Sequence, residues 1–411
     1  MSHSYERLSC RFCGSLDLVT VFNLGTSPLC DEYRTEKPIG DFFPLKLNLC
    51  NNCTSVQTSE VVEPSSIYAD YVYFTHTSPG LDNHFERYAD AVSAVVSEAR
   101  GLVVDVGSND GCLLSHFASL GFKVVGVEPS SSACDYALKK RGVSSINGYF
   151  DRSSVDTILS QRGEASVITF NNVFANIDDL DSLIELTSKL LSKDGLIIIE
   201  SSYLFDMIDN MVFDFIYHEH LSYISLSSLQ KLLGRYGLRV FDVQRVPTKG
   251  GSARYFVARS DSRFVDSINV REMKRSEAQR GSVVDVFREF SQRVFNARSQ
   301  FVRILDGLGS TGRVIGFGAS ATTTTLLHAW QIGDRFHSLM DDNPYKQNTY
   351  SPGYGLVVSP FYDSLLNSDD TVVILAWRFH EQICRSLRDF KGNIVLPLPL
   401  PTVLQRASGI K

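Results

Sequence analysis

Short apolar runs alternate with helical patterns through the middle of the chain. The apolar runs are rich in β-branched residues and predict buried strands at 102–106, 123–127, 165–170 and 195–200. Helical patterns follow from residue 113, at 133–142 and at 180–191. Strands that alternate with helices predict a parallel sheet covered on both faces, with the ligand at the carboxyl ends of the strands.

The flanking segments extend this α/β pattern. A helix is predicted at 81–99, and a helix at 227–236 is followed by an antiparallel hairpin of strands at 239–246 and 253–258. The charged helical stretch 266–310 is interpreted as a long connector. Beyond it, a smaller Rossmann-like unit is predicted from a strand at 313–317, a helix at 324–331 and strands at 336–341, 371–376 and 393–397.

Composition and charge narrow the class of protein. The chain has 411 residues, enough for two or three domains, and its 43% hydrophobic and 21% charged residues are globular values. A net charge of −6 argues against nucleic-acid binding through general basicity. With neither a membrane-spanning run nor a signal peptide in the sequence, we expect a cytoplasmic protein without membrane contact. Its eight cysteines are then expected to be thiols or metal ligands.

Two Cys-x-x-Cys pairs stand near the N-terminus. Cys10 and Cys13 form the first pair, and Cys50 and Cys53 form the second. Each pair fits a tight turn, so four thiolates can converge on one Zn²⁺ in a tetrahedron. Nothing supplies a position open to water, so the site is predicted to be structural. The other cysteines are interpreted as small core residues: Cys30, Cys112, Cys134 and Cys384.

The first strand of the central unit runs into the turn Gly-Ser-Asn-Asp-Gly at 107–111. Such a turn presents backbone amides and a helix N-terminus to a ligand. The second strand ends in Glu128, where a carboxylate can bind ribose hydroxyls. The turn departs from the G-x-G-x-x-G of dinucleotide folds, and its spacing looks like the first two motifs of a Rossmann-like S-adenosylmethionine methyltransferase. An ordinary strand–turn–helix corner is the alternative.

Further candidate residues follow the later strands. Asn171 and Asn176 stand after the strand at 165–170, so both are candidates to face the ligand. In the stretch 213–223, Glu219 and His220 lie among aromatic residues, an arrangement that suits proton transfer. A polar stretch at a helix start, without chemistry, explains these residues equally well.

Two glycine turns are candidate anion sites. Lys249 stands beside two glycines and could meet an anion, although a solvated turn lysine is an equally good interpretation. Gly316 and Gly318 belong to a strand-to-helix turn that could receive a phosphate, and a plain turn is about as good an explanation. Tyrosines in the aromatic-rich stretch 61–80 could line a pocket or pack one domain on the next.

Jointly these motifs resemble the sugar C-methyltransferases of deoxysugar biosynthesis, three-domain enzymes that act on nucleotide-linked 4-keto-6-deoxyhexoses. The resemblance runs nearly end to end. It rests on the cysteine pairs and on VGSNDG at 106–111, NVFA at 172–175, YHEHLSY at 217–223, KGGS at 249–252, GFGAS at 316–320 and LAW at 375–377. It implies an α/β protein with a zinc-binding domain at 1–75, a Rossmann-like methyltransferase domain at 76–268 and a Rossmann-like C-terminal domain at 269–411.

The resemblance also implies roles for particular residues. His220 would be the base that removes the proton beside the ketone, Glu219 would orient or share that proton, and Tyr71 and Tyr217 would lie at the sugar. S-adenosylmethionine would be held by Asp105, Gly107, Ser108, Asn109, Gly111, Glu128, Asn171 and Asn172. The nucleotide diphosphate would lie between the central and C-terminal domains, with Lys249, Tyr223, Gly316 and Gly318 as substrate contacts. Zinc would be bound by Cys10, Cys13, Cys50 and Cys53.

The sequence departs from the family pattern at two positions. Asn176 stands where the family has a histidine, and an asparagine can donate to an oxyanion but cannot shuttle a proton. Thr322 stands where the family has a lysine, so a phosphate-type contact is lost. Both changes bear on the substrate, and neither touches the cofactor turn.

The resulting expectation is C-methylation of a nucleotide-linked 4-keto-6-deoxysugar at the carbon beside the ketone, by a monomer or weak homodimer. Two alternatives stay open. A related enzyme would methylate another position or only epimerise the sugar. A non-catalytic zinc-containing scaffold or nucleic-acid-binding protein would keep only the fold.

Overall fold

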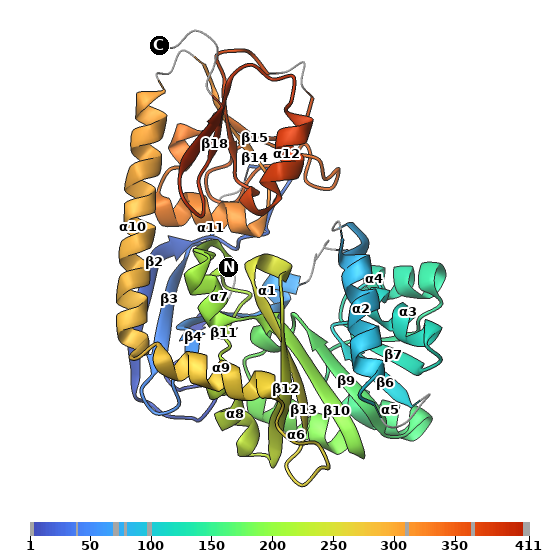
Figure 1. The fold of residues 1–411 in the computed structure, drawn as a ribbon. Helices are drawn as coiled ribbons and strands as arrows, with labels where there is room; N and C mark the ends of the chain where they lie inside the picture. Colours follow the sequence, from blue (N-terminus) through green and yellow to red (C-terminus); the bar gives the residue numbers. More distant parts are fainter. Residues whose placement is uncertain are drawn as a thin grey trace.

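The computed structural model describes residues 4–37, 40–68, 74–77, 80–96, 101–308, 312–362 and 366–405. Three main sheets form an N-terminal, a central and a C-terminal part of the chain, and each carries its own helices (Figure 1). None of the helices within these residues combines the length and the apolar composition that a membrane crossing needs.

The central part contains a seven-stranded sheet in the order β12-β13-β10-β9-β6-β7-β8. The strands β6 to β10 pair in parallel, and the hairpin of β12 and β13 closes one edge antiparallel. The strands are β6 (Leu102–Val106), β7 (Lys123–Glu128), β8 (Ser145–Asn147), β9 (Ala165–Asn171), β10 (Leu191–Ser202), β12 (Leu238–Val246) and β13 (Ser252–Arg259). The helices are α2 (Leu81–Ser93), α3 (Cys112–Ser119), α4 (Ser131–Tyr136), α5 (Arg152–Arg162), α6 (Leu180–Leu190), α7 (Leu204–Asp209) and α8 (Leu226–Gly234).

Both faces of this sheet are buried, as the continuous apolar runs predict. Alternate residues of a strand point to opposite faces, so Val103 and Val104 belong to different clusters. Val103 packs with Phe85 of α2 and Phe117 of α3, and Val104 belongs to the cluster that includes Leu183 of α6. The predicted α/β class with a covered parallel sheet is confirmed.

The N-terminal sheet has four strands in the order β11-β4-β3-β2, and β1 pairs with β5 beside it. Its elements are β1 (Ser4–Glu6), β2 (Leu18–Ser27), β3 (Phe43–Cys50), β4 (Val56–Thr58), β5 (Glu60–Val62) and α1 (Pro64–Tyr68). The fourth strand, β11 (Ser222–Tyr223), comes from the central part of the chain, and Tyr223 pairs with Val56. The stretch that contains His220 is therefore joined to the N-terminal sheet.

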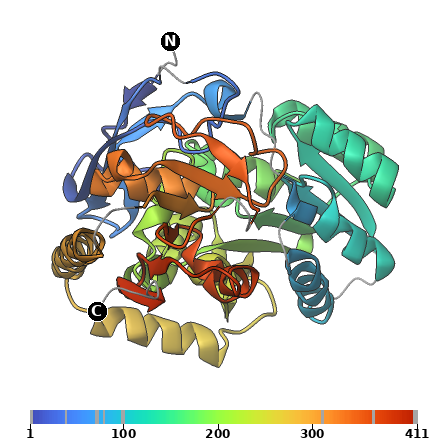
Figure 2. The same cartoon turned by 90° about the horizontal axis from the view of Figure 1, so that it is seen from above.

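The C-terminal sheet has the order β16-β15-β14-β17-β18-β19, with only β19 antiparallel. Its elements are β14 (Val314–Phe317), α11 (Ala321–Trp330), β15 (Ser338–Asp341), β16 (Val358–Pro360), β17 (Thr371–Ile374), α12 (His380–Ser386), β18 (Asn393–Leu396) and β19 (Thr402–Gln405). Helix α11 contacts the N-terminal β2, and Figure 2 shows the C-terminal part lying over the N-terminal sheet when seen from above.

Several predicted boundaries were wrong. Helix α2 ends at Ser93 rather than at 99, and β10 begins at Leu191, before the predicted start at 195. The stretch 266–310 is helical, as its pattern predicts, and it is divided into α9 (Ile268–Gln279) and α10 (Val283–Gly307). Phe290 of α10 packs on Phe22 of β2 with ring centroids 5.1 Å apart. Helix α10 therefore packs beside the N-terminal sheet, and it continues to the C-terminal part (Figure 1).

Candidate functional site

The two cysteine pairs lie on turns that repeat one backbone pattern. The amide of Cys10 donates to the Ser15 carbonyl, and the amide of Gly14 donates back to the Cys10 carbonyl. In the second turn, Cys50 bonds to Ser55 and Thr54 bonds to Cys50 in the same way. Gly14 and Thr54 both have positive φ, 73° and 62°, which the turn requires of its fifth residue.

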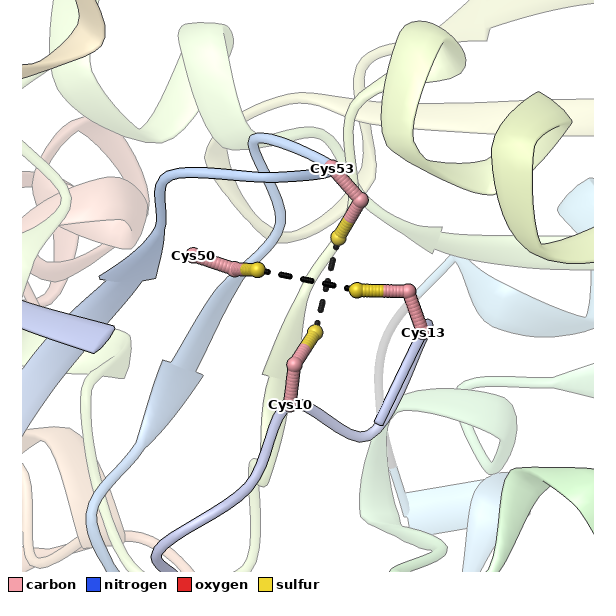
Figure 3. Close-up of side chains that lie close together, drawn as sticks. All are labelled: Cys10, Cys13, Cys50 and Cys53. Carbon is pink, nitrogen blue, oxygen red and sulfur yellow. Dashed lines mark hydrogen bonds between the residues drawn. The ribbon is translucent and has the colours of Figure 1, made fainter. Parts of the chain in front are cut away.

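These turns bring four sulfur atoms together (Figure 3). The Sγ atoms of Cys10 and Cys53 lie 3.4 Å apart, those of Cys13 and Cys50 lie 3.6 Å apart, and all four lie within 4.8 Å of one another. A tetrahedron with Zn–S bonds of about 2.3 Å has S–S edges of about 3.8 Å, so the cluster fits one Zn²⁺. The set is closed by four protein ligands, as the sequence predicts for a structural site.

The glycine turn after β6 forms one wall of a cavity of about 910 Å³. The turn closes tightly: the amide of Gly107 donates to the Val127 carbonyl at 2.8 Å. A Cβ on Gly107 would lie 2.4 Å from Cγ2 of Val173, and its φ is 72°, so glycine is required there. The predicted cofactor residues that line the cavity are Asp105, Gly107, Ser108, Asn109, Glu128, Asn171 and Asn172; Gly111 is the N-cap of α3 beside it.

Glu128 is held at the tip of β7 by two backbone amides. Oε2 accepts from the Asn109 amide at 2.9 Å, and Oε1 accepts from the Ser130 amide at 2.8 Å. Burial raises the pKa of this carboxyl group, against those two bonds. Glu128 lines the cavity and each of its oxygens can accept a further hydrogen bond, so the group fits a pair of ribose hydroxyls. Asp105 lies deeper: its Oδ1 accepts from the Thr169 hydroxyl at 2.6 Å, and burial raises its pKa to about 7.

A short segment before α2 is fastened to the glycine turn. Oδ1 of Asn109 accepts from the amide of Thr75 at 3.0 Å, and Oδ2 of Asp110 accepts from the amide and from Nδ1 of His76, at 2.9 and 2.8 Å. Thr75 thereby reaches the cavity wall. Asn109 was predicted only as a cofactor residue, and its partner Thr75 belongs to no local motif. Tyr71, predicted at the sugar, lies outside the described residues.

His220 is oriented by the loop that leads into β11. Its Nδ1 lies 2.9 Å from the carbonyl of Phe215, an acceptor only, so Nδ1 carries the proton and the Nε2 lone pair is the basic site. The ring packs against Tyr217, with centroids 4.3 Å apart. Burial, and then the nearby charge of Lys249, lower the pKa of His220 to about 4. The imidazole is therefore neutral at physiological pH.

Charged residues from all three parts surround Glu219. Burial, and then the carboxylate of Asp31, raise the pKa of Glu219 to about 8, against the opposing charges of Lys249 and Lys346. Asp31 itself pairs with Lys346 at 2.8 Å. Glu219 is therefore largely protonated near neutral pH, and it can donate a hydrogen bond. Neither Asp31 nor Lys346 stands in a motif, so the sequence did not indicate them.

Lys249 connects this charged group to the cavity. It lines the cavity together with Asn176, and burial lowers its pKa to about 8 against the charges of Glu200 and Glu219. The amide of Leu221 donates to the carbonyl of Ala175 at 2.8 Å, so the His220 loop touches the Asn176 loop directly. Among the described residues, the cavity wall includes Lys249 and Asn176 but not Tyr217, Glu219, His220 or Tyr223.

The C-terminal glycine turn is only partly as expected. Gly316 lies inside β14, where a Cβ would lie 2.4 Å from Leu375, so it serves sheet packing. Gly318 is at the turn, with φ of 114°. At Thr322, where the family lysine is missing, the hydroxyl accepts from Nη2 of Arg378 at 3.2 Å. Arg378 in turn pairs with Asp214 at 3.0 Å, so a cation does lie beside this turn.

Comparisons with known proteins agree with this geometry. A family model described as a C-methyltransferase C-terminal domain matches residues 247–399, a methyltransferase domain matches 81–243, and a zinc binding domain matches 10–68. The C-methyltransferase NovU of Streptomyces niveus is 30% identical over 411 residues, 97% of each chain. This chain belongs to the C-methyltransferase family. It is an S-adenosylmethionine-dependent C-methyltransferase with a four-cysteine zinc-binding site.

Solved structures of other methyltransferases are more distant. The magnesium protoporphyrin IX methyltransferase of Synechocystis PCC 6803 with bound SAM is 15% identical, with 46% of this chain and 86% of that chain covered and a TM-score of 0.34. The CcbJ methyltransferase from Streptomyces caelestis is 16% identical, with 48% and 96% covered and a TM-score of 0.35.

Proposed function

We propose that this C-methyltransferase methylates a nucleotide-linked 4-keto-6-deoxyhexose at the carbon next to the ketone, C-3 in the proposed substrate. The observation that carries the proposal is the state of His220, a neutral imidazole whose Nδ1–H is held by a carbonyl and whose Nε2 is left basic. Methylation at carbon requires removal of a proton from carbon, and a keto group makes the neighbouring C–H acidic enough for an imidazole base.

The residues around His220 supply what the proton transfer needs. Nε2 takes the proton, the C–H electron pair forms the new C=C bond, the carbonyl π pair moves onto the ketone oxygen, and an enolate results. Glu219 is protonated near neutral pH and can donate a hydrogen bond to that oxygen, and the ammonium of Lys249 can stabilise its charge. Bound S-adenosylmethionine would supply the methyl group to the enolate carbon, with the electron pair of the broken C–S bond remaining on sulfur.

Cofactor and substrate are proposed to occupy neighbouring places. The glycine turn and Glu128 would hold the cofactor, and Lys249 and Asn176, which line the same cavity, would face the substrate. Asn176 cannot accept and pass on a proton as a histidine does, so we assign the base to His220 alone, with the Asn176 amide as a donor to the oxyanion. Tyr217 and Tyr223 are proposed to line the sugar-binding site.

The nucleotide diphosphate is proposed to lie between the central and C-terminal parts. Arg378, which donates to the Thr322 hydroxyl beside the turn at Gly318, offers the cation that a diphosphate would use there. We propose domain limits of 1–75, 76–268 and 269–411, and we propose that the protein is a monomer or a weak homodimer.

A cytoplasmic location is supported by the eight cysteines, all of which are described and none of which is in a disulfide.

Mass spectrometry of nucleotide-linked 4-keto-6-deoxysugars tests the proposal. Each sugar is incubated with the protein and S-adenosylmethionine in deuterated water. The expected result is the gain of one methyl group on one sugar. Deuterium uptake without methyl gain would favour the epimerase alternative, and neither change on any sugar would overturn the proposal.

A further inference from the structure

Arg11 is a buried basic residue inside the first cysteine turn. It stands between Cys10 and Cys13, the first pair of zinc-site cysteines, and its side chain bonds to residues outside the sulfur cluster. It is 2% exposed. A buried guanidinium needs hydrogen-bond acceptors, and two of the three acceptors of Arg11 lie in loops that are distant from it in sequence.

Three acceptors surround the guanidinium. Nε donates to Oδ1 of Asp178 at 2.7 Å. Nη1 donates to the carbonyl of Leu221 at 3.1 Å and to the carbonyl of Thr58 at 2.9 Å. The backbone amide of Arg11 is held as well, by Oε1 of Gln57 at 2.8 Å. The charge is thus paired with one carboxylate, which Arg7 also binds, and two peptide oxygens fix the direction of the guanidinium.

Two of these acceptors, Leu221 and Asp178, belong to the loops that contain His220 and Asn176. Leu221 is the residue after His220, and Asp178 lies two residues after Asn176 on the cavity wall. The loops also touch through the Leu221 amide, which donates to the Ala175 carbonyl at 2.8 Å. One guanidinium therefore binds both loops: it bonds the Leu221 carbonyl in the His220 loop and the Asp178 carboxylate in the Asn176 loop.

We propose that Arg11 is a positioning residue that sets the distance and orientation between His220 and the oxyanion donor Asn176. A base must be aimed to within a fraction of an ångström for efficient proton transfer. The planar fork of arginine can satisfy three acceptors in fixed directions, and the single ammonium of a lysine cannot. The first cysteine turn would therefore have two roles, because it presents two zinc ligands and also carries the arginine that holds the His220 loop.

The inference rests on the proposed function and is tested with the Arg11→Lys variant of the full chain, with Arg7→Met as the matched control. Arg7 also bonds Asp178, at 2.8 Å, but its other side-chain bond is to Ser9, within its own segment. Arg11→Met is a second variant, and zinc content and cofactor affinity show whether each variant is folded.

We expect Arg11→Lys to lower kcat at least tenfold while the KM for S-adenosylmethionine stays within threefold and each chain keeps one zinc. Hydrogen–deuterium exchange is the readout independent of activity. The Leu221 amide should exchange at least tenfold faster in Arg11→Lys than in wild type, and at the wild-type rate in Arg7→Met.

Three outcomes overturn the inference: wild-type kcat in Arg11→Lys, unchanged exchange at Leu221, or a loss of zinc and cofactor binding as large as the loss of kcat, which would mean a purely structural role. If the wild-type protein methylates none of the sugars, the proposed function fails instead. The exchange experiment still reports then whether Arg11 holds the two loops together.

Discussion

The imidazole of His220 donates its Nδ1 proton to the backbone carbonyl of Phe215 across 2.9 Å. That bond selects one tautomer, and it directs the lone pair of Nε2 away from the loop. Burial keeps the ring neutral, so no acid–base step is needed before it can accept a proton. The geometry fits a base that is ready before the substrate arrives.

His220→Asn is expected to lower kcat by a factor of about 10² to 10⁴, the usual contribution of a general base. The asparagine amide can still donate to the Phe215 carbonyl, so the loop is retained while the basic nitrogen is lost. The measurement is deuterium uptake by the keto sugar together with methyl gain. The control is His218→Gln, because Nε2 of His218 contacts the Pro44 carbonyl at 3.1 Å on the N-terminal sheet. Full activity in His220→Asn would remove His220 from the mechanism.

The pH dependence of kcat/KM should have no fall near 6.5 on the acid side, since the pKa of His220 is lowered to about 4. On the alkaline side, activity should fall above about pH 8, where both Glu219 and Lys249 lose their protons. Lys249→Arg should move this fall to higher pH, and Glu219→Gln should make it shallower. An acid-side fall near 6.5 would show that His220 is not shielded from solvent in the way that its burial indicates.

Local pattern was sufficient to predict the long strands of the central sheet, the glycine turn and the four-cysteine site. Each of these depends on neighbours within a few residues: Gly107 on its turn, and Cys10 and Cys13 on their knuckle. What could not be predicted depends on pairing across the chain. No local signal shows that Tyr223 pairs with Val56. The same is true of Arg11, which meets Asp178 only in the folded protein, and of the pKa of Glu219, which depends on charges from three separate segments.

The two cysteine turns allow a matched test of backbone strain. Gly14 and Thr54 occupy equivalent positions with φ of 73° and 62°, and no atom lies within 4 Å of a Cβ built on Gly14. Gly14→Ala is therefore expected to cost about 1 kcal/mol in unfolding free energy through its backbone alone. Thr54→Gly should relieve strain, and its stability should stay within about 1 kcal/mol of wild type or exceed it. Urea denaturation of both zinc-loaded variants measures this, and a large loss in Thr54→Gly would contradict it.

Cofactor affinity should depend on the carboxylate of Glu128. Glu128→Gln replaces one acceptor oxygen by an NH₂ group that would meet the amide of Asn109 or Ser130, so a bond is lost and the side chain turns. We expect the Kd for S-adenosylmethionine to rise at least tenfold, which corresponds to about 1.4 kcal/mol. Titration calorimetry measures it. The control is Glu185→Gln, an exposed carboxylate on the outer wall of the same cavity, which should leave the Kd within twofold.

The buried group of Glu200, His84 and Arg254 predicts how the stability of the fold depends on pH. Oε1 of Glu200 lies 2.6 Å from Nε2 of His84, and Oε2 accepts from Arg254 at 2.8 Å. Burial alone would raise the pKa of Glu200, but these bonds outweigh it and hold the pKa below its ordinary value. The stabilisation is thus fully present above the pKa of the unfolded chain and is lost as the pH falls through the lower pKa of the folded state.

Glu200→Gln should therefore cost about 3 to 5 kcal/mol at pH 7, because the guanidinium of Arg254 stays buried without its carboxylate. Its stability should also fall less than that of wild type between pH 5 and pH 3, since the titrating group is gone. Asp135→Asn is the control, because Asp135 forms an exposed pair with Lys139 whose loss should cost no more than about 0.5 kcal/mol. Equal losses in the two variants would show that the buried group contributes no more than a surface ion pair.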